Sequence, residues 1–222
     1  GTFASWRLQP LTKEYFLWFT FLSIGVFGFF ISIDLFTMFM FYEVALIPMY
    51  LLIGVWGSGR KEYAAMKLTL MLMGGSAFLL IGILGIFYGA GGETMNLLEI
   101  AKLHIPHEMQ RIFFPLIFLG FGVLGALFPF HTWSPDGHAS APTAVSMLHA
   151  GVLMKLGGYG CFRVAMYLMP EGAAMWGDVF LILTTISVVY GAFSAVVQTD
   201  LKYINAYSSV SHCGLVLFAL LM

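Results

Sequence analysis

MFYEVALIPMYLLIGVW, residues 40–56, is an apolar run long enough to cross a bilayer, and it contains one carboxylate, Glu43, and one helix breaker, Pro48. A carboxylate costs roughly 2.5 kcal/mol or more at the centre of a membrane helix. The stretch therefore predicts a membrane-spanning helix in which Glu43 serves a specific purpose.

The composition of the whole chain is that of a polytopic membrane protein. Hydrophobic residues make up 60% of the 222 residues, charged residues only 9%, and the mean hydropathy is +0.90. A soluble domain carries about 25% charged residues. There is no basic tract that would predict nucleic-acid binding, and two isolated cysteines indicate neither a disulfide framework nor a metal site. The lipid bilayer is the expected partner of most of the surface.

Runs of about 20 apolar residues predict an all-α fold with about seven transmembrane helices. The expected helices are Tyr15–Ser32, Leu35–Trp56, Glu62–Tyr88, Ile112–Phe128, Pro142–Leu168, Trp176–Val197 and Tyr203–Met222. Residues 93–110 form the one long polar stretch, with a short amphipathic helix near Leu97–Ala101, and His131–Ala141 is expected to be a loop. The chain starts without Met and stops inside an apolar run, so we expect it to be an internal piece of a longer polypeptide.

Lysine and arginine are unevenly distributed between the two ends of these helices, which predicts the orientation. The more positive side holds Arg7, Lys13, Arg60, Lys61 and Lys202, and the other side holds Lys102, Arg111 and Arg163. Cytoplasmic loops carry the excess of positive charge, so the N-terminal end is expected in the cytoplasm.

Glu43 lies near the centre of its predicted helix. It follows Asp34 by nine residues, which is about 13 Å of helix in a hydrocarbon core about 30 Å thick. It is either a structural carboxyl group, protonated or bonded to a neighbouring helix, or a proton-carrying or ion-coupling group, which is the default interpretation at this depth. Pro48 leaves the carbonyl of Val44 without its helical donor. The proline is therefore either a kink that serves packing or a source of polar backbone beside Glu43.

A second pair of ionisable residues falls in the middle of the Pro142–Leu168 helix. Lys155 is too far from either end to extend easily to the headgroups, and His149 precedes it by six residues, about a turn and a half. Lys155 is predicted to be a functional group that holds or releases a proton. His149 alone is typical of a satisfied core histidine, but beside Lys155 it is a candidate proton relay.

Other polar groups carry less specific signals. Lys67 lies close enough to the start of its helix to extend to the interface, although it could also reach Glu43 across a helical hairpin. His131, Asp136 and His138 are expected in a capped turn, because a metal site there would lack a fourth ligand. Glycines near residues 120–125 and 157–160 predict close helix packing or local breaks.

Five segments resemble the antiporter-like membrane subunits of respiratory complex I, in particular the subunit M or chain 4 branch. The similarity covers nearly the whole chain. The segments are FYEVALIPMY (41–50), EYAAMK (62–67), FPFHTWSPDGH (128–138), APTAVSMLHAGVLMKLGGYG (141–160) and TDLKYINAYSSVSHCG (199–214).

The resemblance implies a proton-translocating subunit of an NADH–quinone oxidoreductase, built from two inverted five-helix repeats. Residues 1–168 would form the first repeat and residues 169–222 the start of the second. Glu43 and Lys155 match the glutamate and the lysine of the first half-channel, with Lys67 and His149 as further candidates. This chain would hold no cofactor or metal; NADH, FMN, iron–sulfur clusters and quinone would be bound by partner subunits. A bacterial plasma membrane or a mitochondrial inner membrane is the expected location.

The sequence departs from the resemblance at Leu124. These subunits usually place a lysine seven residues before the loop histidine, which is His131 here, and that lysine pairs with the glutamate that Glu43 matches. Either Lys67 or the His149–Lys155 pair takes that role, or the half-channel works differently. A cation/proton antiporter subunit, a membrane-bound hydrogenase subunit and a non-transporting scaffold remain alternatives.

Overall fold

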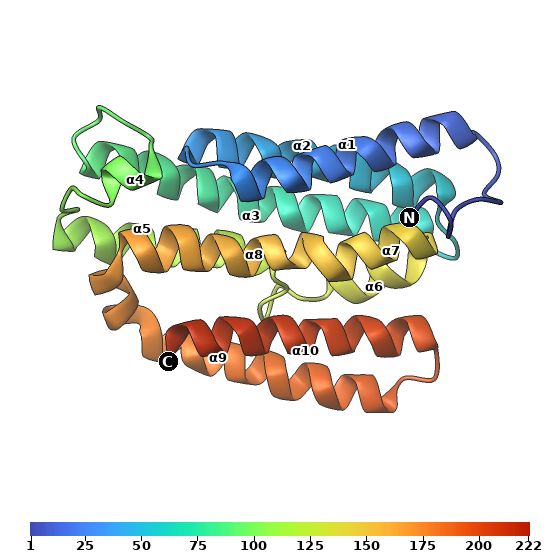
Figure 1. Ribbon diagram of the computed structural model, residues 1–222. Helices are drawn as coiled ribbons and strands as arrows, with labels where there is room; N and C mark the ends of the chain where they lie inside the picture. The colour runs from blue at the N-terminus through green and yellow to red at the C-terminus, as the bar shows by residue number, and fades with distance from the viewer.

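The computed structural model describes residues 1–222 as a bundle of long helices that run side by side (Figure 1). Its only β feature is an isolated bridge between Asp34 and Asn96. The elements are α1 Thr12–Ile31, α2 Leu35–Trp56, α3 Lys61–Gly89, α4 Leu97–Ile100, α5 His107–Leu124, α6 Trp133–Ser140, α7 Thr143–Leu148, the π-helix η1 His149–Leu153, α8 Met154–Gly160, the π-helix η2 Cys161–Met166, α9 Pro170–Val197 and α10 Leu201–Leu221. The all-α prediction is confirmed.

Five of these helices, α1, α2, α3, α9 and α10, are long and apolar enough to span a membrane, and the chain is an integral membrane protein. Two more rods lie beside them in Figure 1. One consists of α5 and α6, and the other runs continuously from α7 to η2. The chain thus passes seven times along the bundle, in alternating directions, as the apolar runs predicted.

Helix α2 has the bounds that the sequence predicted. It begins after Asp34, whose Oδ1 accepts a hydrogen bond from the amide of Thr37 at 3.0 Å, so the carboxylate satisfies an amide that the helix leaves free. Pro48 lies inside a continuous helix and does not end it. Because the helix continues on both sides, Glu43 and Pro48 occupy successive turns of one rod.

The prediction of a loop over His131–Ala141 is wrong, because residues 133–140 form the helix α6. The preceding helix ends at Leu124, not at Phe128, and Ala126 takes a positive φ of 56°. Together α5 and α6 form one rod that is broken in the middle. Glycine at 125 and proline at 129 explain the break, since neither residue favours a continuing helix.

Backbone groups in the break have partners, which a break at membrane depth requires. The amide of Leu127 donates to Gly122 O at 2.8 Å, and the amide of Phe128 donates to Ser187 Oγ of α9 at 2.6 Å. The indole Nε1 of Trp133 donates to Val123 O at 3.0 Å. Side chains of neighbouring elements therefore replace hydrogen bonds that the α-helix would have made.

The rod from α7 to η2 carries two π-helical stretches, one on either side of Lys155. Its glycine face packs against the break in the other rod. A Cβ built on Gly157 would lie 2.5 Å from the amide nitrogen of Gly125, so only glycine fits at this contact. The sequence predicted close helix packing or local breaks at the glycines. Both occur, because the close-packed Gly157 lies against the break between α5 and α6.

Candidate functional site

Lys67 and Asp136 form an ion pair between α3 and α6, with 2.6 Å between Lys67 Nζ and Asp136 Oδ2. About a quarter of each side chain remains exposed. The hydroxyl of Tyr203 on α10 approaches the other carboxylate oxygen, Asp136 Oδ1, at 3.4 Å. The pair connects residues that are 69 positions apart in the sequence, and it ties the short helix α6 to the long helix α3.

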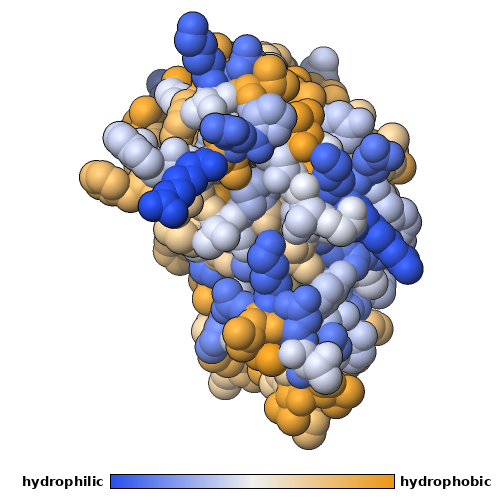
Figure 2. Space-filling model, turned by 90° about the vertical axis from the view of Figure 1, so that its right-hand side faces the viewer, coloured by the Kyte–Doolittle hydropathy of each residue, from blue (hydrophilic) through white to orange (hydrophobic).

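A polar cavity of about 780 Å³, which we name the vestibule, opens beside this pair. It lies at the end of the bundle where α2 turns into α3 and α9 turns into α10, and hydrophilic side chains gather at this end in Figure 2. Its lining is Ser58, Gly59, Arg60, Tyr63, Ala64, Asp136, Ala139, Ser140, Asp200, Lys202 and Tyr203. This is also the end with the more positive loops, so the expected orientation places the vestibule on the cytoplasmic side.

A histidine cluster joins α6, α7 and η1. Ser146 Oγ forms a short hydrogen bond with Nδ1 of His138, and the ring centroids of His138 and His149 are 5.5 Å apart. His149 is fully buried and stacks on Trp133 with 5.3 Å between ring centroids. Nε2 of His138 and both ring nitrogens of His149 are buried without a protein hydrogen-bond partner. Such orphaned nitrogens are unusual in a core, and they are available to water or a proton.

Lys155 points away from this cluster, toward α10. Its Nζ donates to Ala150 O at 2.7 Å and lies 3.8 Å from Cys213 Sγ. Within the described chain the side chain of Lys155 is exposed, although it lies midway along its rod. His149 and Lys155 share one rod, but the structure packs His149 against Trp133 and His138 on the interior.

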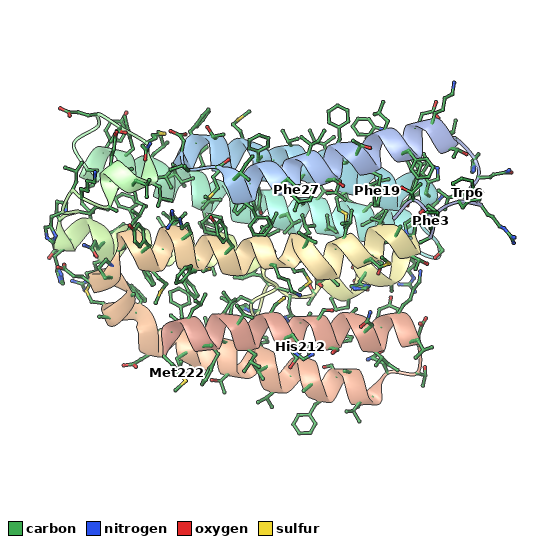
Figure 3. The ribbon with its side chains drawn as sticks, in the orientation of Figure 1. Phe3, Trp6, Phe19, Phe27, His212 and Met222 are labelled. Atoms are coloured by element: carbon green, nitrogen blue, oxygen red, sulfur yellow. The ribbon has the colours of Figure 1, made fainter.

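Glu43 has no partner within the chain. Its Oε1 is buried and makes no hydrogen bond. Lys67, which the sequence allowed to reach Glu43, pairs with Asp136 instead, and Leu124 is a buried core residue. His212 lies exposed about halfway along α10 (Figure 3).

Sequence reasoning missed Asp136 and Lys202 as parts of the site. Asp136 was expected in a capped turn, and Lys202 was counted only among the cations of the more positive side. Lys202 Nζ instead donates to Ala139 O at 3.1 Å and to Ala141 O at 3.0 Å, the carbonyls at the C-terminal end of α6. The one available signal was Pro135, because proline is tolerated in the first turn of a helix as well as in a turn. The described chain has no cluster of three or more His, Cys, Asp or Glu side chains suited to a metal ion.

Seven helical rods, one of them broken, define a polytopic α-helical membrane protein. Residues 32–222 match the family described as NADH:quinone oxidoreductase/Mrp antiporter, transmembrane. The chain belongs to this family.

Among the curated relatives, NAD(P)H-quinone oxidoreductase chain 4 3 of Picosynechococcus sp. is 40% identical over 219 residues, which cover 98% of this chain and 40% of the relative. The chloroplastic NAD(P)H-quinone oxidoreductase chain 4 of Citrus sinensis is 39% identical over 224 residues, covering 99% of this chain and 45% of the relative. The chain thus spans about two fifths of the length of the curated relatives that it matches.

Solved structures share the fold. A chain of respiratory complex I from Thermus thermophilus matches with a TM-score of 0.85 and 29% identity, over 90% of this chain and 43% of that one. A chain of the membrane-bound sulfane sulfur reductase, an archaeal respiratory membrane complex, matches with a TM-score of 0.87 and 28% identity, over 97% of this chain and 45% of that one. A chain of the Mrp complex from Dietzia sp. shares the fold, with a TM-score of 0.80 and 22% identity over 92% of this chain and 38% of that one.

Proposed function

We propose that this chain carries the first proton-transfer half-channel of a proton-translocating membrane subunit in an NADH– or NAD(P)H–quinone oxidoreductase complex. The observation that supports the proposal is the succession of ionisable groups along the broken rod and its neighbour. The Lys67–Asp136 pair adjoins the vestibule, the His138–His149 cluster follows, and Lys155 lies beyond it. Ionisable groups are costly at this depth, so several in succession indicate a path rather than packing.

Each group has a role that its chemistry allows. The Lys67–Asp136 pair exchanges protons with water in the vestibule. An imidazole accepts a proton on one ring nitrogen and releases one from the other, so His138 and His149 can relay it inward. Lys155 holds the proton near the membrane centre. A carboxylate that approaches an ammonium group favours its charged form, and a carboxylate that withdraws favours release of the proton.

In this proposal Glu43 is the carboxylate that approaches and withdraws from the ammonium group of Lys155. Its Oε1 is not engaged by any other residue of the chain, so it is free to bind a group that moves during turnover. Electron transfer belongs to partner subunits in this proposal. These would bind NADH, FMN, iron–sulfur clusters and quinone; the names of the relatives mention NAD(P)H and quinone. Residues 1–168 then form the first five-helix repeat, and residues 169–222 begin the second.

The test uses membrane vesicles that contain the complete complex with Glu43→Gln in the full-length subunit. Glutamine keeps the size of the side chain but cannot exchange a proton, so we expect fewer protons translocated per electron while quinone reduction by NADH or NADPH continues. Glu99→Gln, on the short helix α4, is the matched control and should leave the ratio unchanged. Undiminished translocation in Glu43→Gln contradicts the proposal.

Two alternatives have distinct signatures in the same vesicles. The matched family also contains Mrp antiporters, so a cation/proton antiporter would acidify or alkalinise vesicles in response to a sodium gradient without NADH or NADPH. A scaffold subunit would tolerate Lys155→Ala in proton translocation but lose assembly of the complex. Leu124, where a lysine is usual, is the feature that favours the scaffold reading.

A further inference from the structure

Lys202 occupies an unusual position between two cavities. One is the vestibule of about 780 Å³. The other, which we name the inner cavity, measures about 220 Å³ and is lined by His138, Thr143, Ser146, Met147, Ala150, Leu201, Lys202 and Asn205. Lys202 is the one residue that lines both. Lys202 therefore borders both the vestibule and the cavity beside the histidine cluster.

The bonds of Lys202 explain why it stays there. A helix leaves its last carbonyls without partners and carries partial negative charge at that end. At the end of α6, Ser140 O accepts from the amide of Ser58 at 2.8 Å, while Ala139 O and Ala141 O both accept from Lys202 Nζ. One lysine thus completes the C-terminal cap of a helix that starts inside the membrane. Bonds from an ammonium group to two carbonyls are stronger than neutral ones.

Lys202 also has alternative acceptors within the vestibule. The carboxylates of Asp200 and Asp136 line the same cavity, and Arg60 is the other cation of the lining. Asp200 Oδ1 accepts from the amide of Lys202 at 2.9 Å, which fixes the backbone but leaves the long side chain able to turn. The ammonium group therefore has one set of acceptors on α6 and another in the vestibule.

The inner cavity leads on to the next group of the path. Ala150 lines it, and Ala150 O is the acceptor of Lys155 Nζ. His138 and Ser146 form another part of its wall, and His138 keeps a buried nitrogen without a protein partner. The inner cavity therefore borders both the histidine cluster and Ala150, the residue whose carbonyl binds the central lysine.

We propose that Lys202 is a positioning residue that separates the vestibule from the inner cavity while its ammonium group binds the end of α6. Moving the ammonium group to the vestibule carboxylates joins the two cavities and lets water reach His138. The proposal deepens the proposed function and rests on it, because it assigns the control of proton access to the half-channel. Since Lys202 belongs to α10 and its acceptors to α6, any shift between these helices changes the barrier.

The barrier that Lys202 forms between the two cavities is tested by the rate at which a water-soluble reagent reaches the inner cavity. Ala150→Cys is introduced into the full-length subunit, and vesicles containing the complete complex are treated with a membrane-impermeant, positively charged methanethiosulfonate. Parent vesicles without the added cysteine give the baseline from Cys161 and Cys213, which are both buried. Gly59→Cys, in the vestibule lining, identifies the vesicle orientation in which the reagent reaches this end.

We expect Lys202→Met to raise the labelling rate at Ala150→Cys about tenfold, the factor expected when a charge-assisted hydrogen bond is lost. Lys202→Arg retains the cation and should stay within about twofold of the parent. Arg60→Met is the matched control, because it removes a cation from the vestibule that no described bond joins to α6. If Lys202→Met prevents assembly, Lys202→Gln replaces it and should give a smaller increase.

Labelling within about twofold of the parent in Lys202→Met, or in Lys202→Gln where that variant is used, overturns the proposal, since these side chains cannot form the ammonium bonds. An equal increase in Arg60→Met overturns it as well, because the effect would then be one of general charge. The labelling rate does not depend on proton transport. Failure of this inference is therefore distinguishable from failure of the proposed function, which the proton-to-electron ratio tests.

Discussion

Glu43 and Asp136 are both carboxylates on helices of the membrane bundle, but their surroundings are opposite. Asp136 has Lys67 at 2.6 Å, a second donor in Tyr203 and an aqueous vestibule beside it. Glu43 has a buried oxygen with no partner in the chain. The Lys67–Asp136 ion pair thus lies on the broken rod near the vestibule, and Glu43 takes part in no ion pair within the chain. Asp136 is held in place by its partners, whereas no bond within the chain holds the side chain of Glu43.

The most severe test of this comparison supplies Glu43 with the lysine that the resemblance leads one to expect. Leu124→Lys alone should assemble, because Glu43 can pair with the new ammonium group. The double variant Leu124→Lys/Glu43→Gln leaves that charge unpaired in the membrane, a cost of about 3 kcal/mol. We expect the double variant to be strongly depleted from the assembled complex on native gels. Equal amounts of both variants would show that residues 43 and 124 do not interact.

The next test removes the partnered carboxylate. Asp136→Asn leaves Lys67 as an unpaired, partly exposed cation, and we expect a loss of about 1–3 kcal/mol in stability together with reduced proton translocation. Thermal inactivation of the purified complex measures the first effect. Glu43→Gln serves as the comparison and should shift stability by less than about 0.5 kcal/mol, because its buried oxygen has no bond to lose. A larger loss of thermal stability for Glu43→Gln than for Asp136→Asn would mean that Glu43, and not Asp136, is the carboxylate whose bonds stabilise the fold.

The smallest effect is expected at an ion pair in water. His107 Nδ1 and Glu171 Oε2 are 3.1 Å apart at the opposite end of the bundle from the vestibule, and their side chains are 58% and 42% exposed. His107→Gln should therefore change thermal stability by less than about 1 kcal/mol and leave proton translocation intact. A loss comparable to that of Asp136→Asn would mean that position in the membrane does not decide the strength of these pairs.

The membrane spans could be predicted from the sequence because apolar length is a local property. Helix α2 has its predicted bounds, since Asp34 and the Gly57–Gly59 turn mark both ends. The broken rod could not be predicted, because residues 133–140 are polar enough to be typical of a loop, and only packing against α3 and α10 makes them helical. The resemblance identified the family correctly, as the comparisons confirm.

The candidate site was harder to predict than the fold. Lys67 and Asp136 are both visible in the sequence, but nothing local indicates that they meet across 69 positions. The position of Lys155 along its rod follows from counting residues, whereas its direction toward Cys213 depends on how α8 and α10 pack. The roles of Glu43, Lys155, His149 and Lys67 in proton transfer stay predictions, and the experiments above address them.

The contact between Gly125 and Gly157 has a mechanical consequence. The backbones of the two rods touch at Gly125 and Gly157, and side chains join the rods elsewhere, such as Trp133 stacked on His149. One rod carries Lys155, two residues from the contact, and the other carries the break that leads to α6. Because no side chain separates the two backbones at the glycine contact, a displacement of one rod toward the other there must be accommodated by the other rod.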